Sequence, residues 1–459
     1  MVQKALSALL QYAIQRQLIE ETDKIYAANR ILALIGETVF APTAVDGDIF
    51  QTIDDMLGPL CEAAAAHGKL PIDTVTTRDV LCADIMDVLT PMPSTVIRTF
   101  DERYQTDPKA ATDYFYALSR ANNYIMTERV RKNIEWRADS PYGELLVTVN
   151  LSKPEKDPRD IAAAKAQRQT GYPKCLLCPE NVGFEGGGNH PPRANHRTVP
   201  LTLGGERWHL QYSPYVYYPE HCIVLNDRHV PMKVDRALFA KLLEFVERFP
   251  HYFVGSNADL PIVGGSILTH DHFQGGRFDM PMALAPIEQS VTINGFEQVQ
   301  AGIVKWPLSS IRLMADDPTV LADAADRVLT AWRGYTDETN DIIAHTDAPH
   351  NTITPIARKR DGRFELDLIL RNNRTTDEHP LGIFHPHKEY HHIKKENIGL
   401  IEAMGLAVLP PRLKDAYDLN DADTRQMIGD VFAHILDNCG VFKNTHAGRA
   451  GFLRFIQQI

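Results

Sequence analysis

The segment 260–276 constrains this chain most, because it joins an apolar run to two histidines one residue apart. The run 260–268 predicts a buried strand. Alternate side chains of a strand share a face, so we expect His270 and His272 to project the same way, with Gln274 on that face two residues further on. The pattern predicts two imidazoles at one site, where imidazole can attack phosphorus, bind a metal or transfer a proton.

Two cysteines upstream have the spacing of a metal site. Cys175 and Cys178 are two thiols that can bind one tetrahedral zinc ion through a tight turn. The six cysteines are otherwise widely spaced, which argues against a disulfide framework. A short apolar strand, 222–225, leads to His229. The histidine pair alone could be a structural metal clip, and these neighbours favour a functional site.

Composition and charge limit the kind of protein and its partners. A chain of 459 residues with 44% hydrophobic and 23% charged residues can bury a large core in two or three domains. No apolar run of about 18 residues is present, and residues 1–7 lack a signal pattern, so we expect a soluble cytoplasmic protein outside membranes. The net charge of -11 disfavours nonspecific binding to nucleic acid. An anionic ligand would need local cations, helix ends and backbone amides.

Three regions differ in their hydrophobic pattern. Apolar residues recur at helical spacing over 6–35, and helical signals continue over 111–131, which predicts a helical N-terminal domain at 1–140. We expect that domain to serve packing or dimerisation, since a fold-level feature does not indicate chemistry. Strand-like alternation begins near residue 145, which predicts a second domain at 141–300 and a third at 301–459.

The second and third regions show related patterns. In the second region, a helix is predicted to begin after Asp235 as its N-cap and to end at Pro250. In the third, a helix at 319–332 precedes a hairpin at 352–371, with Asp361-Gly362 as its turn. Strands before and after a helix indicate an α+β fold with antiparallel sheets, and not a dinucleotide-binding βαβ fold.

Several stretches of the chain match one known family together. The stretches are 151–157, 175–183, 211–215, 270–276 and 391–400. They resemble the galactose-1-phosphate uridylyltransferases, a branch of the histidine-triad superfamily, and most closely the bacterial class II group. With the helical N-terminal segment that class II also carries, the resemblance covers nearly the whole chain. It implies two histidine-triad-like antiparallel sheet units with packed helices after a helical domain, and a homodimer.

The resemblance implies a two-step reaction at His272. This histidine would attack the α-phosphorus of UDP-glucose, expel glucose 1-phosphate and become a uridylyl-histidine. Galactose 1-phosphate would then take the uridylyl group to give UDP-galactose. Gln274 would donate a hydrogen bond to a phosphoryl oxygen. The alternatives are that His272 is a zinc ligand or structural, and that Gln274 is a surface or turn residue.

The resemblance also implies a substrate-binding set. The residues expected to hold the substrate are Asn257, Gly264, Gly265, Ser266 and Lys395. The match is imperfect at 267–269, where other branches have Ser-Asn-Pro before the first histidine. Lys395, followed by Gly399, would reach the sugar-phosphate end, but it could equally be a solvated surface lysine. Arg193 and Arg197 are alternative phosphate contacts.

By the same correspondence, the chain carries a Cys2His2 zinc site that anchors the strand bearing the nucleophile. The expected ligands are Cys175, Cys178, His229 and His270. His221 and His209 are alternatives to His229. A second metal site could lie in a further cluster, whose ligands we leave unassigned: His385, His387, His391 and His392.

Two other functions stay open at this point. One is another nucleotide-sugar phosphorylase or nucleotide hydrolase of the same superfamily, in which phosphate or water replaces the sugar phosphate. The other is a zinc-stapled structural or binding module without catalysis. The sequence does not distinguish galactose 1-phosphate from another hexose 1-phosphate, because that choice depends on one or two hydrogen bonds.

Overall fold

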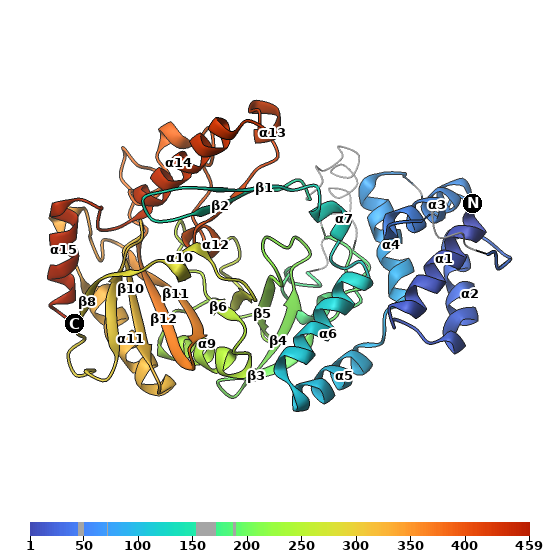
Figure 1. Ribbon diagram of the computed structural model, residues 1–459, viewed down its shortest axis with the longest axis horizontal. Helices are drawn as coiled ribbons and strands as arrows, with labels where there is room; N and C mark the ends of the chain where they lie inside the picture. Colours follow the sequence, from blue (N-terminus) through green and yellow to red (C-terminus); the bar gives the residue numbers. More distant parts are fainter. Residues whose placement is uncertain (45–49, 71, 153–170, 187–189) are drawn as a thin grey trace. The chain divides into compact units, whose positions relative to one another are not determined.

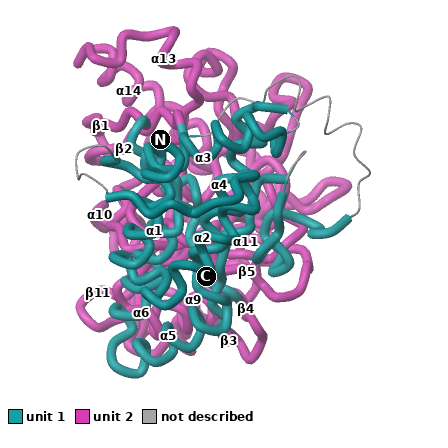
Figure 2. Tube along the Cα trace, turned by 90° about the vertical axis from the view of Figure 1, so that its right-hand side faces the viewer, with its two compact units in different colours: residues 1–132, 152–200, 209–216 teal, residues 133–151, 201–208, 217–459 magenta. Residues whose placement is uncertain are grey.

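The chain divides into two units, which Figure 2 shows in different colours. The computed structural model describes residues 1–44, 50–70, 72–152, 171–186 and 190–459. Unit 1 comprises Met1–Lys132, Ser152–Pro200 and His209–Val216, and unit 2 comprises Asn133–Leu151, Leu201–Trp208 and Tyr217–Ile459. The family-like residues 153–157 lie outside the described residues. Division of the chain at residues 140 and 300 stays a prediction.

Unit 1 is mainly helical, as predicted for the N-terminal region. Its described helices are α1 (Val2–Gln15), α2 (Lys24–Ile35), α3 (Ile53–Ala66), α4 (Val75–Leu89), α5 (Pro93–Thr106), α6 (Pro108–Ala121) and α7 (Thr127–Val130). The side chains of Thr52 and Thr74 form capping boxes at α3 and α4. They accept hydrogen bonds from amides that a helix leaves unpaired in its first turn. The predicted helical spacing over 6–35 corresponds to α1 and α2.

Among the described residues, no single helix is long and apolar enough to cross a membrane. Helices α4 and α5 reach that length and composition only when taken together, and they meet at a bend of 61°.

A ten-stranded sheet organises unit 2 (Figure 1). Its strands are β3 (Val199–Leu203), β4 (Glu206–Tyr212), β5 (Cys222–Asn226), β6 (Phe253–Gly255), β7 (His272–Gly276), β8 (Ile287–Val291), β9 (Gln300–Val304), β10 (Ser310–Ala315), β11 (Asn351–Arg360) and β12 (Arg363–Asn372). The strand order is β3-β4-β5-β7-β6-β11-β12-β10-β9-β8, and β3 and β4 include residues of both units. The pairings from β5 to β8 are antiparallel. The predicted α+β class with antiparallel sheet structure is confirmed.

Two helices pack against this sheet. Helix α9 (Arg236–Arg248) and helix α11 (Pro318–Gly334) contact each other, and both contact β11. Asp235 caps α9 by accepting a hydrogen bond from the amide of Leu238, as predicted. The predicted hairpin is also confirmed, because β11 and β12 are joined by Asp361 and Gly362, whose φ angles of 50° and 83° suit a tight hairpin turn.

A smaller layer completes the core of unit 2. Strands β1 (Ile134–Ala138), β2 (Leu145–Val149) and β13 (Leu406–Leu409) form a three-stranded sheet. The other α-helices that the structure describes in unit 2 are α10 (Pro281–Leu284), α12 (Leu400–Ala403), α13 (Leu413–Ala416), α14 (Ala422–Cys439) and α15 (His446–Ile456). Trp136, Val147 and Phe432 belong to one buried cluster that joins this sheet to α14.

The apolar run 260–268 forms turns, so its prediction as a buried strand is wrong. Ile262 has a φ of 73°, which an extended strand does not accommodate. Gly264 makes an isolated bridge with Ala258, and a Cβ on it would lie 2.5 Å from the Ala258 carbonyl oxygen. Strand β7 begins only at His272, so His270 precedes the strand.

A buried ion network lies in the second half of the sheet. Nε of Arg312 donates to Asp367 at 2.7 Å, Nη2 of Arg358 donates to the same carboxylate at 2.8 Å, and Arg358 also pairs with Glu365. Burial raises the pKa of Asp367, but the charges of Arg358 and Arg312 outweigh it and lower that pKa below its usual range. The stabilisation of the folded protein by ionised Asp367 is therefore complete above the pKa that this carboxyl has in the unfolded chain. It is lost as pH falls through the pKa of Asp367 in the folded protein.

We predict that Asp367→Ala strongly destabilises the protein, because it removes a buried carboxylate that pairs with two buried guanidinium groups. Breaking a buried pair of this kind typically costs about 3–5 kcal/mol in the free energy of unfolding. Urea denaturation of the variant at neutral pH measures the loss. The control is Asp316→Ala, since Asp316 pairs with Arg363 but its side chain is 85% exposed. Equal destabilisation by the two variants would contradict a special role for the buried network.

Candidate active site

His272 and Gln274 lie on one face of strand β7. His272 opens the strand and is 6% exposed. Strand β7 runs between β5 and β6, and it pairs His272 with Leu225 and Gln274 with Ile223. Alternate residues of a strand share a face, so the two side chains project to the same side. The structure therefore brings together the two residues that the sequence analysis expected to be catalytic.

The hydrogen bond of His272 determines which ring nitrogen has the lone pair. Its Nδ1 lies 2.8 Å from the carbonyl oxygen of His270. A carbonyl oxygen only accepts, so Nδ1 carries the hydrogen and donates it. Burial lowers the pKa of His272 to about 4, against the opposing effect of this hydrogen bond. The ring is therefore neutral near pH 7, with its lone pair on Nε2, as a nucleophilic imidazole requires.

Gln274 is in contact with His221, which the sequence offered as an alternative metal ligand. His221 Nε2 lies 3.0 Å from Gln274 Oε1. His209, the other alternative, has its Nδ1 3.3 Å from the hydroxyl of Thr198. The sequence pattern gives no signal for the contact of His221 with Gln274, because that contact depends on the register between β5 and β7.

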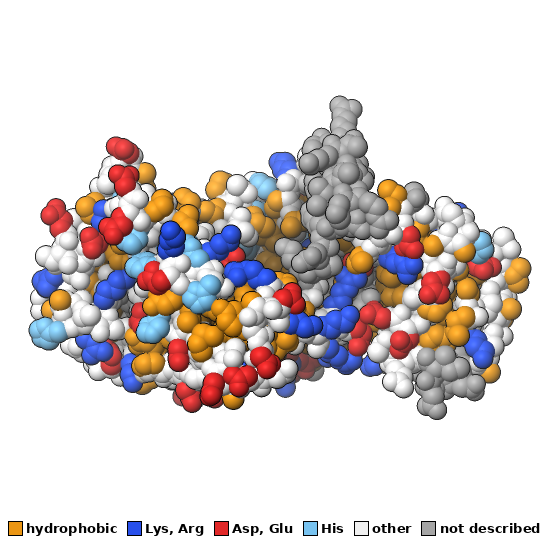
Figure 3. Space-filling model, turned by 90° about the horizontal axis from the view of Figure 1, so that it is seen from above, with side chains coloured by type: hydrophobic (Ala, Val, Ile, Leu, Met, Phe, Trp, Pro, Cys, Tyr) orange, Lys and Arg blue, Asp and Glu red, His pale blue; other side chains and the backbone are white. Residues whose placement is uncertain are grey.

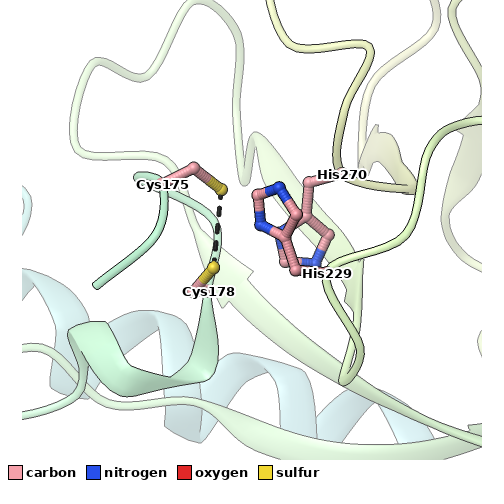
Figure 4. Close-up of side chains that lie close together, drawn as sticks. All are labelled: Cys175, Cys178, His229 and His270. Carbon is pink, nitrogen blue, oxygen red and sulfur yellow. Dashed lines mark hydrogen bonds between the residues drawn. The ribbon is translucent and has the colours of Figure 1, made fainter. Parts of the chain in front are cut away.

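The four residues expected to bind a metal ion lie close together in the structure (Figure 4): Cys175, Cys178, His229 and His270. One possible ligand atom of each residue lies within 4.8 Å of those of the other three. The two Sγ atoms are 3.6 Å apart. This is close to the separation of about 3.8 Å that two thiolates have when each binds a tetrahedral zinc ion at about 2.3 Å. The donor set and spacing fit a metal ion.

The ring orientation of His270 also suits a metal ligand. Its Nε2 lies 2.7 Å from the carbonyl oxygen of Asn226, so Nε2 donates and the lone pair is on Nδ1. Metal-binding histidines usually donate their second ring N–H to a carbonyl or carboxylate in this way. The centroid of the His229 ring lies 4.9 Å from that of the His270 ring. Asn226, at the end of β5, is a supporting residue that the sequence analysis did not identify.

Asn257 and the glycine pair lie in the turns before β7. The side-chain oxygen of Asn257 accepts a hydrogen bond from the amide of Leu400 at 2.9 Å. A Cβ on Gly265 would lie 2.6 Å from Asn257 Nδ2, and Gly264 is equally close to neighbouring backbone. Both glycines are therefore required by close packing of the chain itself. Ser266 is exposed.

The two lysines that precede α12 have different environments. Lys394 is buried, and its ammonium donates to the carbonyl of Val408 and pairs with Glu402 at 3.0 Å. Lys395 is exposed. Gly399 lies close to Asn257, since a Cβ on it would be 3.3 Å from Asn257 Oδ1. The segment that carries Lys395 therefore continues directly to the Asn257 side chain.

The alternative phosphate contacts, Arg193 and Arg197, are both buried in unit 1. Arg197 pairs with Asp87 at 2.8 Å and donates to several backbone carbonyls. Its donors thus serve the fold of unit 1. The guanidinium of Arg193 lies 5.4 Å from the ring centroid of Tyr124, in cation–π geometry.

The histidines of segment 385–392 make contacts that hold the chain. His385 contacts the side chain of Asn397 at 3.1 Å, and His391 donates to the carbonyl of Pro386 at 2.9 Å. Among the residues that the structure describes, they do not join a converging group of three or more metal-ligand atoms.

On the face shown in Figure 3, histidine side chains reach the surface beside Lys and Arg side chains, although the net charge of the chain is -11.

Two family models match the chain one after the other. The first describes the N-terminal domain of galactose-1-phosphate uridyl transferase and matches residues 17–231. The second describes the C-terminal domain and matches residues 244–435. Together with the antiparallel sheet and its histidine-bearing strand, these matches define the chain as a nucleotidyltransferase.

Full-length relatives give the particular family. A galactose-1-phosphate uridylyltransferase of Bacillus subtilis is 49% identical, over 99% of this chain and 97% of its own. One from Halalkalibacterium halodurans is 50% identical, over 99% and 98% of the two chains. The chain belongs to the galactose-1-phosphate uridylyltransferase family. A crystal structure of yeast Ap4A phosphorylase Apa2 is 14% identical, covering 76% of this chain and 95% of that one, with a TM-score of 0.39.

We predict that Gly265→Ala lowers the melting temperature, because the added methyl group must displace the Asn257 amide and weaken its hydrogen bond to Leu400. Overpacking of this kind typically costs about 1–3 kcal/mol. Differential scanning calorimetry measures the change. The control is Gly334→Ala, where a Cβ meets no atom within 4 Å. An unchanged melting temperature for Gly265→Ala would show that the turn has room for a side chain.

Proposed function

We propose that this protein exchanges a uridylyl group between UDP-glucose and galactose 1-phosphate through a covalent adduct on His272. The observation that carries the proposal is the hydrogen bond from His272 Nδ1 to the carbonyl of His270, at 2.8 Å. It leaves Nε2 of a neutral ring as the nucleophile. Relatives at 49% and 50% identity, each named a galactose-1-phosphate uridylyltransferase, support the same reaction.

In the first step, the Nε2 lone pair of His272 forms a bond to the α-phosphorus of UDP-glucose. The bond from that phosphorus to the bridging oxygen breaks, and glucose 1-phosphate leaves with the electron pair. The uridylylated ring is then positively charged, and the Nδ1–H bond to the carbonyl of His270 becomes charge-assisted and stronger. A neutral nucleophile also approaches the phosphates without charge repulsion.

In the second step, a phosphate oxygen of galactose 1-phosphate attacks the same phosphorus. The P–N bond breaks, its electron pair returns to Nε2, and UDP-galactose is released. Gln274, two residues along the same face, is proposed to donate an amide hydrogen to a phosphoryl oxygen where negative charge builds up in both steps. Loss of such a donor typically lowers the rate about 100-fold or more.

The substrate contacts are proposed from the placement of the remaining residues. Asn257 adjoins the segment that carries Lys395, whose exposed ammonium is suited to a sugar phosphate. Ser266 is exposed and could present its hydroxyl to the ligand. Gly264 and Gly265 are proposed to contribute backbone amides, as the resemblance to the family implies, and both lie within the match to the C-terminal family model.

Zinc is the metal that we propose for the Cys/His group. Two thiolates and two imidazoles are preferred zinc ligands, and a site with four protein ligands leaves no position for substrate. A bound ion would therefore supply structural stability. Because His270 is one of the four residues, the ion would fix the backbone whose carbonyl orients His272. The zinc site and the nucleophile would then be linked through a single residue.

We further propose that the enzyme acts in the cytoplasm as a homodimer. The cytoplasm is where the proposed substrates, nucleotide sugars and sugar phosphates, are expected. Two-fold assembly is the commonest symmetry of soluble homo-oligomers.

We predict that brief incubation with UDP-glucose alone adds one uridylyl group to the protein, because the first step needs no acceptor. Intact-protein mass spectrometry after an alkaline quench measures the adduct. His272→Ala should form no adduct, whereas His67→Ala, which changes an exposed histidine of the helical unit, should form it normally. A full adduct on His272→Ala would assign the nucleophile to another residue.

The acceptor that discharges this adduct separates the competing activities. We expect galactose 1-phosphate to remove the uridylyl group and to yield UDP-galactose. Discharge by inorganic phosphate would indicate a phosphorylase, and rapid discharge in buffer would indicate a hydrolase. The proposal of a purely structural zinc-bound module predicts no adduct under any of these conditions.

We predict that the purified protein holds one zinc ion per chain and that Cys178→Ser lowers this content, because the serine hydroxyl is a much poorer zinc ligand than a thiolate. Inductively coupled plasma mass spectrometry measures the metal. The matched control is Cys439→Ser, which changes a buried cysteine outside the Cys/His group. Equal metal content in Cys178→Ser and the unaltered protein would exclude this thiol as a ligand.

A further inference from the structure

His221 occupies a position from which it can reach the proposed catalytic amide. It directly precedes β5, in which Cys222 pairs with Gly275 of β7. One further step of this antiparallel register sets His221 opposite Gly276. Since Gly276 has no side chain, the imidazole can extend across it to Gln274, the diagonal neighbour on the same face. The observed distance from His221 Nε2 to Gln274 Oε1 is 3.0 Å.

The imidazole of His221 is held in place by aromatic neighbours. It is 2% exposed, and its centroid lies 4.6 Å from that of the Tyr218 ring. The hydroxyl of Tyr218 donates to the carbonyl of Gly275 at 3.2 Å, which ties that ring to β7. A Cβ on Gly276 would lie 2.8 Å from the Tyr218 ring, so the glycine also makes room for it. His221 is therefore a fixed partner for Gln274.

The other ring nitrogen indicates which atom donates in this contact. Nδ1 of His221 is buried and has no hydrogen-bond partner within the described part of the chain. Burial lowers the pKa of His221 to about 4, so near pH 7 the ring is neutral and carries one hydrogen. If that hydrogen were on Nδ1, a buried donor would be unsatisfied, which is rarer in proteins than an unsatisfied acceptor. The hydrogen is better placed on Nε2, where it is donated to Gln274 Oε1.

This assignment also fixes the amide of Gln274. When the side-chain oxygen accepts from His221, the amide nitrogen must point the other way. Gln274 is only partly buried, unlike His221 and His272. Part of its surface is therefore open to a ligand on the face that it shares with His272.

We infer that His221 is a positioning residue: it donates from Nε2 to Gln274 Oε1 and so directs the Gln274 amide N–H groups toward the phosphoryl group at His272. The inference rests on the proposed uridylyl transfer and adds a residue to it. His221 itself contacts neither the substrate nor the reacting atoms in this scheme. Its role is to prevent the Gln274 amide from turning its oxygen toward the phosphate, where two acceptors would face each other.

The test compares His221→Leu, which removes the donor, with His221→Gln, which can supply an amide N–H near the same place. We expect His221→Leu to lower kcat about 10-fold with little change in KM for UDP-glucose, since a misdirected donor acts mainly on the transition state. His221→Gln should recover most of kcat. Equal loss in both variants, or a loss confined to KM, would overturn the inference.

A double substitution separates positioning from general support of the fold. In a Gln274→Ala background there is no amide to orient, so His221→Leu should lower kcat no further. A multiplicative loss in the double variant would show that His221 acts independently of Gln274. His67→Leu, at an exposed histidine of the helical unit, controls for the histidine-to-leucine change itself.

A measurement on the unaltered protein covers the case in which His221→Leu does not fold. In protein with ¹⁵N-labelled histidine, the nitrogen shifts of His221, assigned by comparison with His221→Gln, should be those of the Nε2–H tautomer. The Nδ1–H tautomer would overturn the inference. Failure of the proposed function is distinct, because the unaltered enzyme would then form no uridylyl adduct, whereas failure of this inference leaves exchange intact.

Discussion

The hydrogen bond between His272 and the carbonyl of its neighbour His270 is the interaction on which the rest of the site depends. It sets the tautomer of a buried neutral ring and so determines which nitrogen can react. The carbonyl belongs to a residue whose own ring is oriented by Asn226 at the end of β5. One short turn of chain therefore connects the Cys/His group, the nucleophile and two strands of the sheet.

The pairing of strands in the sheet fixes the relative positions of the residues at this site. His272, Gln274 and Gly276 share one face of β7, and the pairing of β5 with β7 determines what lies across from them. The absence of a side chain on Gly276 leaves room for the Tyr218 ring, which in turn packs beside His221. Residues that are distant in sequence thus form one row of neutral groups, without an ion pair among them. A buried network of charged side chains lies instead in the second half of the sheet.

Local chemistry made much of the fold predictable from the sequence. Asp235 before an apolar helical repeat identified α9, and Asp361-Gly362 identified the turn of the β11–β12 hairpin, because caps and tight turns depend on a few adjacent residues. The segment 260–268 was mistaken for a strand, because apolar composition does not reveal backbone turns. The contact of His221 with Gln274 was missed for a related reason: it follows from strand register, which no local pattern encodes.

The joint between the two halves of the large sheet gives α9 and α11 a mechanical role. Strand β6 is only three residues long, and it meets β11 through two residue pairs, Gly255 with Ile356 and Val254 with Ala357. Such a short ladder resists bending or shear weakly by itself. Helix α9 contacts both β6 and β11, and it also packs on α11. The helices therefore brace the sheet across its narrowest joint, so that the strand carrying His272 has a rigid support even where backbone pairing is sparse.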